Sequence, residues 1–327
     1  MRRRSFIGAI SGAAVAWPFA ASAQRTGLPV VGFLSPQSAG AAVASRIAGF
    51  LAGLSELHYV EGQNVSIDYV WADGHYDRLP ALANDLVRRK VAVIAALTQD
   101  AALAAKAATA TIPIVFNVGG DPVRSQLVAS MSRPGGNATG ISMFTNQLEA
   151  KRLALLHELA PKVTAVGVLI NPDNASAEKE QREVEAAARS LGLQVHIRRA
   201  SRDSDLADAC ESLAQSGARA LMPVADPFFA SQRERLVALA AKHSLPAIWE
   251  WPDFVEGGGL MSYGTSIVDN YRQAGVYTGR VLKGEAPANL PVVQPTKFVL
   301  AVNLKTARTL GIEVPPTLIA GADQVIE

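Results

Sequence analysis

Two short stretches of the sequence share one pattern. Residues 30–38 read VVGFLSPQS, and residues 165–174 read AVGVLINPDN. In each, a short β-branched apolar run contains a Gly and is followed by Ser or Asn, then by Pro and polar residues. Such a run is too short for a typical helix and predicts a buried strand that ends in a turn. Each copy leads into a long Ala-rich segment, which favours the first strand of a βα series.

The repetition continues in the same order along the chain. Later strand starts lie 135, 130, 127 and 133 residues after their counterparts (166 against 31, 195 against 65, 220 against 93, 245 against 112). This near-constant offset indicates two similar domains rather than a solenoid. We therefore expect an α/β protein of two similar Rossmann-like lobes with parallel sheets, joined by a multi-strand hinge. Besides the two copies, the expected strands are 65–70, 91–97, 112–117, 194–199, 218–224, 245–250 and 296–303, and the expected helices are 41–57, 77–90, 100–109, 149–159, 203–216, 229–243 and 271–282.

The N-terminus has the features of an export signal. Arg3-Arg4 followed by Ser-Phe-Ile matches the twin-arginine pattern, an apolar stretch follows, and Ala21-Ser22-Ala23 is a small-residue cleavage site. We predict a signal peptide over residues 1–23, cleavage after Ala23, and a periplasmic mature chain. Removing three arginines lowers the formal charge from +2 to −1, so the basic balance does not indicate a nucleic-acid partner.

Two extended segments predict crossings between the lobes. Pro134-Gly135-Gly136-Asn137 makes a turn before the extended run ATGISM, and GGGLMSYG at 257–264 predicts a second crossing. A third crossing is expected at the strand 296–303. The predicted N-terminal lobe is therefore 28–140 plus about 262–290, and the predicted C-terminal lobe is 141–261 plus about 291–320. Several crossings make a hinge, since few residues absorb the rotation.

Polar loops follow the expected strands of both halves. In parallel sheets, ligands bind at the carboxyl ends of the strands, where free helix N–H groups favour negative charge. The loops of the first half hold Ser35, Gln37, Thr98, Gln99 and Asp121. Those of the second half hold Asn171, Asn174, Asp226 and Glu250. We therefore expect each lobe to contribute half of a ligand site, with the two halves facing each other.

The sequence contains none of the motifs sought for catalysis. G-x-S-x-G, the P-loop and H-E-x-x-H are absent, the five histidines are scattered, and Cys210 is the single cysteine. We therefore expect no enzyme activity, no cofactor and no metal. Carboxylates at Asp100, Asp121, Asp226 and Glu250 leave a hydrolase as the less favoured alternative.

The chain resembles the periplasmic solute-binding proteins of ABC transporters with the type I two-lobe fold, and more closely the subgroup that includes tryptophan-binding proteins. The resemblance covers residues 28–327. Its motifs are VGFLSPQS, IPIVFNVGGDPV…RPGGNATGIS, VGVLINPDNASAE, PVADPFFASQRERLVALAAKHSLPAIW and the long segment from EGGGLMSYGTS to NLKTARTLGI. It implies that a small solute binds between the lobes, which close and deliver it to an inner-membrane ABC permease. We expect a monomer. The alternative is a ligand-sensing periplasmic module, in which the same two-lobe closure signals to a membrane receptor kinase instead of serving a permease.

In the subgroup's aromatic-amino-acid binders the ligand is a zwitterion. For such a ligand we expect hydroxyls and helix N-termini to bind the carboxylate, and Asp121 or Asp226 to bind the ammonium. Phe228, Trp249 and Trp251 are candidates for an apolar wall. Trp249, inside a strand, is equally suited to the lobe core, whereas Trp251 lies past the strand's end. Tyr263 is expected to contact the ligand from the second crossing.

Overall fold

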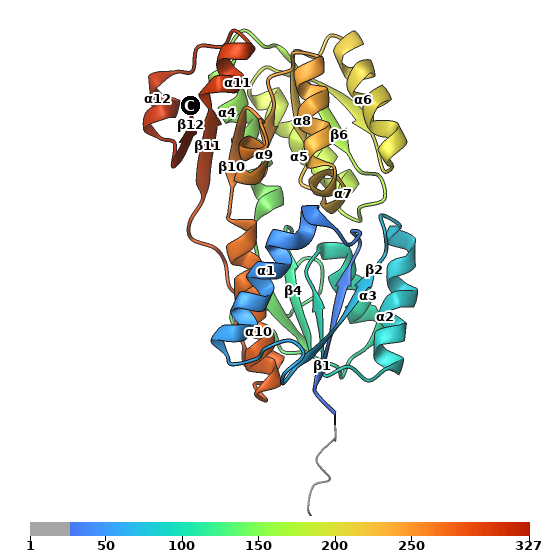
Figure 1. The fold of residues 1–327 in the computed structure, drawn as a ribbon. Coiled ribbons are helices and arrows are strands. Elements are labelled where there is room, and N and C mark those ends of the chain that lie inside the picture. The colour runs from blue at the N-terminus through green and yellow to red at the C-terminus, as the bar shows by residue number, and fades with distance from the viewer. Residues whose placement is uncertain (1–26) are drawn as a thin grey trace, which may run out of the picture.

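The computed structural model describes residues 27–327 as two α/β lobes, one above the other in Figure 1. The predicted signal at 1–23 lies outside the described residues. The first lobe is built on five parallel strands in the order β2-β1-β3-β4-β5. These strands are β1 Val30–Ser35, β2 Ser66–Trp71, β3 Val93–Ala96, β4 Ile114–Val118 and β5 Ala138–Ser142.

Helices cover both faces of this sheet, which explains why its strands read as nearly continuous apolar runs. The helices are α1 Ala41–Glu56, α2 Leu79–Arg88, α3 Gln99–Ala108 and, from much later in the chain, α10 Ile267–Leu282. Alternate strand residues face opposite sides. Val93 and Ala95 pack in the same core as Phe50 of α1, whereas Ile94 and Ala96 pack with Leu86 of α2.

Helices α1 and α10 lie side by side with their backbones in close approach (Figure 1). Glycines make this possible. A Cβ on Gly53 would lie 1.9 Å from the carbonyl oxygen of Arg272, and one on Gly275 would lie 2.0 Å from that of Phe50. Because Gly53 and Gly275 have no side chain, the backbones of α1 and α10 can pack this closely.

The second lobe contains the three-stranded parallel sheet β7-β6-β8 and the four-stranded sheet β9-β10-β11-β12. A parallel bridge between Leu221 and Ala247 joins them. β11 runs antiparallel to β10, and β12 runs parallel to β11. The strands are β6 Ala165–Ile170, β7 Gln194–Arg199, β8 Ala220–Pro223, β9 Ile248–Trp249, β10 Met261–Gly264, β11 Val299–Asn303 and β12 Gln324–Ile326.

Eight helices of this lobe flank its strands in the part of the chain that the structure describes. They are α4 Glu149–Leu159, α5 Ala177–Ser190, α6 Asp203–Gln215, α7 Pro227–Ser231, α8 Arg233–Lys242, α9 Pro252–Glu256, α11 Leu304–Thr309 and α12 Pro316–Ala320. Single 3₁₀ turns lie at Tyr76–Arg78, Thr145–Leu148 and Pro287–Asn289. The helix expected at 229–243 is divided, because the chain leaves helical geometry at Gln232 between α7 and α8.

The chain passes between the lobes in three places, after β5, after β10 and before β11. Residues 261–264 are a strand of the second sheet, since β10 pairs with β9 and β11. The extended Leu-Met-Ser-Tyr run therefore precedes the crossing, which falls at Thr265 and Ser266. Val293 pairs with Ile141 of the first lobe before the third passage.

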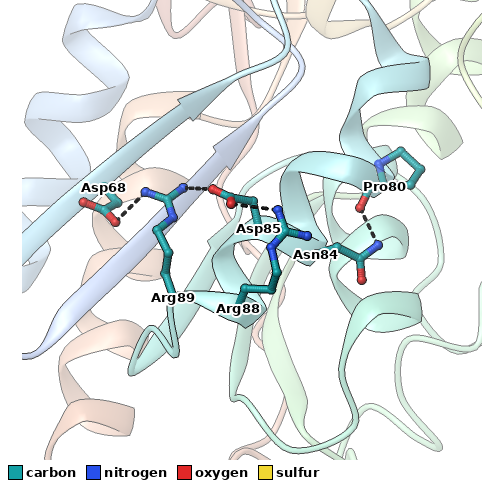
Figure 2. A network of polar contacts seen from close by, with 6 residues as sticks. All are labelled: Asp68, Pro80, Asn84, Asp85, Arg88 and Arg89. Atoms are coloured by element: carbon teal, nitrogen blue, oxygen red, sulfur yellow. Dashed lines mark hydrogen bonds and ion pairs between the residues drawn. The ribbon is translucent and has the colours of Figure 1, made fainter.

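A surface network ties α2 to β2 in the first lobe. Figure 2 shows Arg89 between Asp68 and Asp85, with N–O distances of 2.9 and 2.7 Å, and Arg88 at 2.9 Å from Asp85. Asn84 donates to the carbonyl of Pro80 at 2.9 Å. Because these side chains are largely solvated, their pairs add little to the free energy of unfolding.

Over residues 27–327, none of the helices combines the length and the apolar composition that crossing a bilayer requires.

Candidate functional site

The loops at the carboxyl ends of the two sheets face one another and enclose a cavity between the lobes. Its volume is about 50 Å³, far smaller than that of the neighbouring interlobe groove of about 910 Å³. The first lobe, with the crossing after β5 and with α10, contributes Gln37, Arg46, Leu97, Thr98, Gln99, Asp100, Asn117, Gly119, Gly120, Met143, Thr145, Asn146, Ile267 and Tyr271. The second lobe contributes Asn174, Ser176, Ala225, Asp226, Pro227 and Trp251.

Direct hydrogen bonds join three pairs of residues across the lobes beside this cavity. Gln37 Nε2 donates to the carbonyl of Pro227 at 2.9 Å, and the Tyr76 hydroxyl donates to Asp226 at 3.2 Å. The backbone N–H of Ala175 donates to Asp100 Oδ1 at 3.1 Å. The structure is therefore a closed arrangement of the two lobes.

Asp226 is fully engaged within the protein. It is the N-cap of α7 and accepts a hydrogen bond from the N–H of Phe228 at 2.8 Å. Asn171 and Asn174 donate to its two oxygens at 3.0 and 2.7 Å. Burial raises the pKa of Asp226, and these hydrogen bonds oppose the rise. The carboxylate positions the loops of the second lobe.

Asp100 is the second residue of α3, and only one of its two carboxylate oxygens accepts a hydrogen bond within the described chain. Its Oδ1 accepts from Ala175, but its buried Oδ2 has no hydrogen-bond partner among residues 27–327. Burial raises the pKa of this carboxyl to about 6. Asp100 is still mainly ionised at neutral pH, so the cavity contains an acceptor suited to a cationic group.

Other polar atoms in the cavity wall are also buried without a hydrogen-bond partner in the described chain. Buried polar atoms are nearly always bonded, because leaving one unsatisfied costs about 1–3 kcal/mol. Such atoms gathered around one cavity indicate a site that a polar ligand completes. They are Gln99 Oε1, both side-chain polar atoms of Asn117, Thr145 Oγ1, Trp251 Nε1, and Nε and Nη2 of Arg46.

Arg46 brings a buried positive charge to the same wall. It lies on α1, its side chain is 3% exposed, and its guanidinium carbon lies 4.8 Å from the ring centroid of Trp251 in the other lobe. Its Nη2 is 4.0 Å from the carboxylate of Asp253. An apolar part of the wall lies beside these groups and consists of Leu97, Met143, Trp251, Ile267 and Tyr271.

Five of the eleven site residues chosen from the sequence line the cavity: Gln37, Thr98, Gln99, Asn174 and Asp226. Ser35 and Asn171 are buried just behind it. Ser35 accepts the N–H of Gln37 at 3.1 Å, and Asn171 is the partner of Asp226 described above. Thr98 caps α3 by accepting the N–H of Ala101.

The other four chosen residues lie outside the cavity wall. Asp121 caps its own loop through the N–H groups of Val123 and Arg124. Phe228 lines the outer groove, and the ring of Tyr263 stacks on Phe298 near the hinge. Glu250 is buried and away from the wall, and burial raises its pKa to about 8. Of the two tryptophans considered, Trp249 stacks on Phe254 in the core and Trp251 lines the cavity.

The polar and aromatic wall residues that were not among the eleven chosen, apart from Trp251, are Arg46, Asp100, Asn117, Thr145, Asn146, Ser176 and Tyr271. A signal for Arg46 was present, because it is the only charged residue between Ala41 and Ser55. It also lies at helical spacing with Val43, Phe50 and Leu54, which are buried. A lone arginine on the apolar face of a helix needs a polar or charged partner, so this pattern predicts a buried polar site beside α1.

No cluster of three or more His, Cys, Asp or Glu side chains placed to hold a metal ion occurs between residues 27 and 327.

Comparisons with known proteins agree with this architecture. The family model described as ABC transporter substrate binding protein matches residues 31–326. A tyrosine-binding protein of Clostridioides difficile is 26% identical over 265 residues, which are 81% of this chain and 76% of that protein. A Vibrio cholerae conserved domain protein of known structure is 27% identical, with a TM-score of 0.82, covering 91% of this chain and 99% of that one.

A further solved structure is an ABC domain from Streptococcus pneumoniae in complex with L-Trp. It is 26% identical, with a TM-score of 0.81, and the match covers 92% of this chain and all of that one. The match to the family model spans nearly all of the described residues and both lobes. The chain belongs to the family of ABC transporter substrate binding proteins.

Proposed function

We propose that this solute-binding component captures an amino acid with an aromatic side chain between its lobes and delivers it to an ABC permease in the inner membrane. One observation carries the proposal. Buried polar atoms without partners among residues 27–327 share a single interlobe cavity with an apolar wall that includes Trp251 and Tyr271. An aromatic amino acid combines charged and hydrogen-bonding ends with an apolar ring, and so matches both parts.

The ammonium of the ligand has a partner in Asp100. Its free Oδ2 is a buried acceptor at the N-terminal end of α3. Asp121 and Asp226, the two candidates named from the sequence, are engaged by their own loops. The relatives that bind tyrosine and tryptophan by their names support the same ligand class.

Ligand capture is coupled to closure because both lobes contribute to the cavity. A ligand that touches residues of both lobes binds the closed form more tightly, and so shifts the hinge equilibrium toward it. The hydrogen bonds from Gln37, Tyr76 and Ala175 form in the same movement. The chain acts after export by the signal over residues 1–23, as a monomer and without turnover of its ligand.

The test is a thermal-shift and calorimetric screen of the chain from Gln24 to Glu327 against the twenty L-amino acids. At a concentration of 100 times Kd, a ligand that binds only the folded form stabilises it by about 2.7 kcal/mol. L-Trp or L-Tyr is expected to raise Tm and to titrate with one site per chain. The proposal fails if only non-amino-acid solutes bind. Chromatography of the ligand recovered after denaturation checks that it is unchanged.

A further inference from the structure

Arg46 is a buried cation with two side-chain nitrogens that no residue of the described chain satisfies by a hydrogen bond. Its side chain is 3% exposed, it lines the interlobe cavity, and neither Nε nor Nη2 has a hydrogen-bond partner in the described chain. Burying a guanidinium without hydrogen bonds is costly, and proteins compensate such charges with an anion.

The carboxylates nearest to Arg46 compensate its charge only in part. Asp253 accepts a direct hydrogen bond from Arg233 at 2.9 Å, whereas its distance to Arg46 Nη2 is 4.0 Å. Glu250 interacts electrostatically with Arg46. Burial raises the pKa of Glu250 to about 8, however, so this carboxyl is mostly protonated at neutral pH. Burial likewise raises the pKa of the Tyr271 phenol, although the adjacent Arg46 opposes the rise through its charge and a side-chain hydrogen bond, so the phenol stays neutral and supplies no anion.

The guanidinium is nevertheless held in place. It lies over the face of Trp251, an attraction between a cation and a ring that fixes the plane of the group and leaves its edges free to donate. Arginine presents its N–H groups as a rigid fork that pairs with carboxylates through two parallel hydrogen bonds. Arg46 therefore brings to the cavity wall a planar, buried donor with two nitrogens that the described chain leaves without a partner.

We propose that Arg46 binds the carboxylate of the ligand, so that a carboxylate is required for tight binding. This inference rests on the proposed function and assigns the negative end of the ligand to Arg46, opposite in charge to the Asp100 subsite. The contact also depends on closure, since Trp251 belongs to the second lobe and Arg46 to the first. A ligand without a carboxylate leaves the buried guanidinium unsatisfied in the closed form.

The test compares four probes on the wild-type chain: L-tryptophan, L-tryptophanamide, tryptamine and indole-3-propionic acid. The first and last carry a carboxylate, whereas the second and third do not. Calorimetry is expected to show at least about 100-fold tighter binding of L-tryptophan than of L-tryptophanamide. Arg46→Gln should reduce that preference to less than about fivefold, and Arg46→Lys should retain part of it.

Two matched variants separate a ligand contact from a structural role. Arg235→Gln removes an exposed arginine of α8 that does not line the cavity, and should leave the preference for the acid over the amide unchanged. Asp100→Asn should instead abolish the preference of L-tryptophan over indole-3-propionic acid. Circular dichroism melts confirm that each variant is folded.

The outcomes distinguish this inference from the function on which it rests. If Arg46→Gln keeps the wild-type preference, or if the wild type binds acid and amide equally, Arg46 is not the carboxylate partner, although amino-acid binding stands. If the wild type binds indole-3-propionic acid but no amino acid, the proposed ligand class is wrong and the role of Arg46 is supported. Failure of every carboxylate-bearing probe overturns the inference.

Discussion

The hydroxyl of Tyr76 in the first lobe donates a hydrogen bond to the carboxylate of Asp226 in the second lobe at 3.2 Å. Tyr76 lies in the 3₁₀ turn before α2, and Asp226 caps α7. Burial and the adjacent carboxylates of Asp226 and Asp100 raise the pKa of the tyrosine, which keeps the hydroxyl protonated as a donor. The bond exists only when the lobes are together.

Replacing Tyr76 with Phe should therefore favour the open form. A hydrogen bond to a charged group contributes about 1.5 kcal/mol or more, which is roughly tenfold in the ratio of closed to open molecules. Ligand Kd should rise by about the same factor, and small-angle scattering should show a larger radius of gyration. Tyr69→Phe removes a solvent-exposed bond to Glu61 within one lobe and should change neither quantity.

Replacing Asp226 with Ala should destabilise the second lobe itself. The change removes an N-cap and leaves the amides of Asn171 and Asn174 without their acceptor. We expect the free energy of unfolding to fall by about 3 kcal/mol, measured by denaturant titration without ligand. Asp121→Ala, which removes a half-exposed loop cap, should cost about 1 kcal/mol. Equal losses for both variants would contradict the role assigned to Asp226.

Glu250 should make stability depend on pH. Its pKa is about 8 in the folded chain because burial disfavours the charged form, against 4.5 for an ordinary glutamate. The folded state thus holds a proton that the unfolded state releases, so this group lowers the free energy of unfolding as pH rises from about 4.5 to 8.

A neutral replacement, Glu250→Gln, should remove that loss. Tm at pH 8.5 is expected to rise by roughly 2–5 °C relative to wild type, and the difference should shrink toward pH 5. Scanning calorimetry at several pH values measures it. Glu256→Gln, at an exposed glutamate of α9, is the control for the loss of one carboxylate. A difference that does not vary with pH would show that Glu250 titrates normally.

The close approach of α1 and α10 predicts a strong effect of one methyl group. In Gly53→Ala the new Cβ would meet the carbonyl oxygen of Arg272 at 1.9 Å, so the helices must separate. We expect a loss of at least about 3 kcal/mol in the free energy of unfolding. Because α1 carries Arg46 and α10 carries Tyr271, ligand binding should also weaken. Ala52→Ser, on the exposed side of α1, should be nearly neutral.

The two-lobe architecture was predictable because it repeats a local pattern. The strands β1, β3 and β4 of the first sheet are buried on both faces, so their apolar runs can be recognised in the sequence alone, as at Val31 and Phe33 of β1. The short helix α7 was harder to predict. Asp226 and Pro227 mark its start, but the break at Gln232 that separates it from α8 depends on packing.

The sequence by itself determined the two α/β lobes, the polar loops at their facing edges and the family of the chain, because strand periodicity and turn chemistry are local properties. Only the tertiary structure decided which loop residues face the cavity. Asp226, Asn171 and Asn174 satisfy one another across 52–55 residues of chain, whereas Asp100 and Arg46 are charged residues of the cavity wall with side-chain atoms that have no hydrogen-bond partner in the described chain. Whether a buried polar atom is paired depends on neighbours that are distant in the sequence, and so it follows from the fold rather than from the residue.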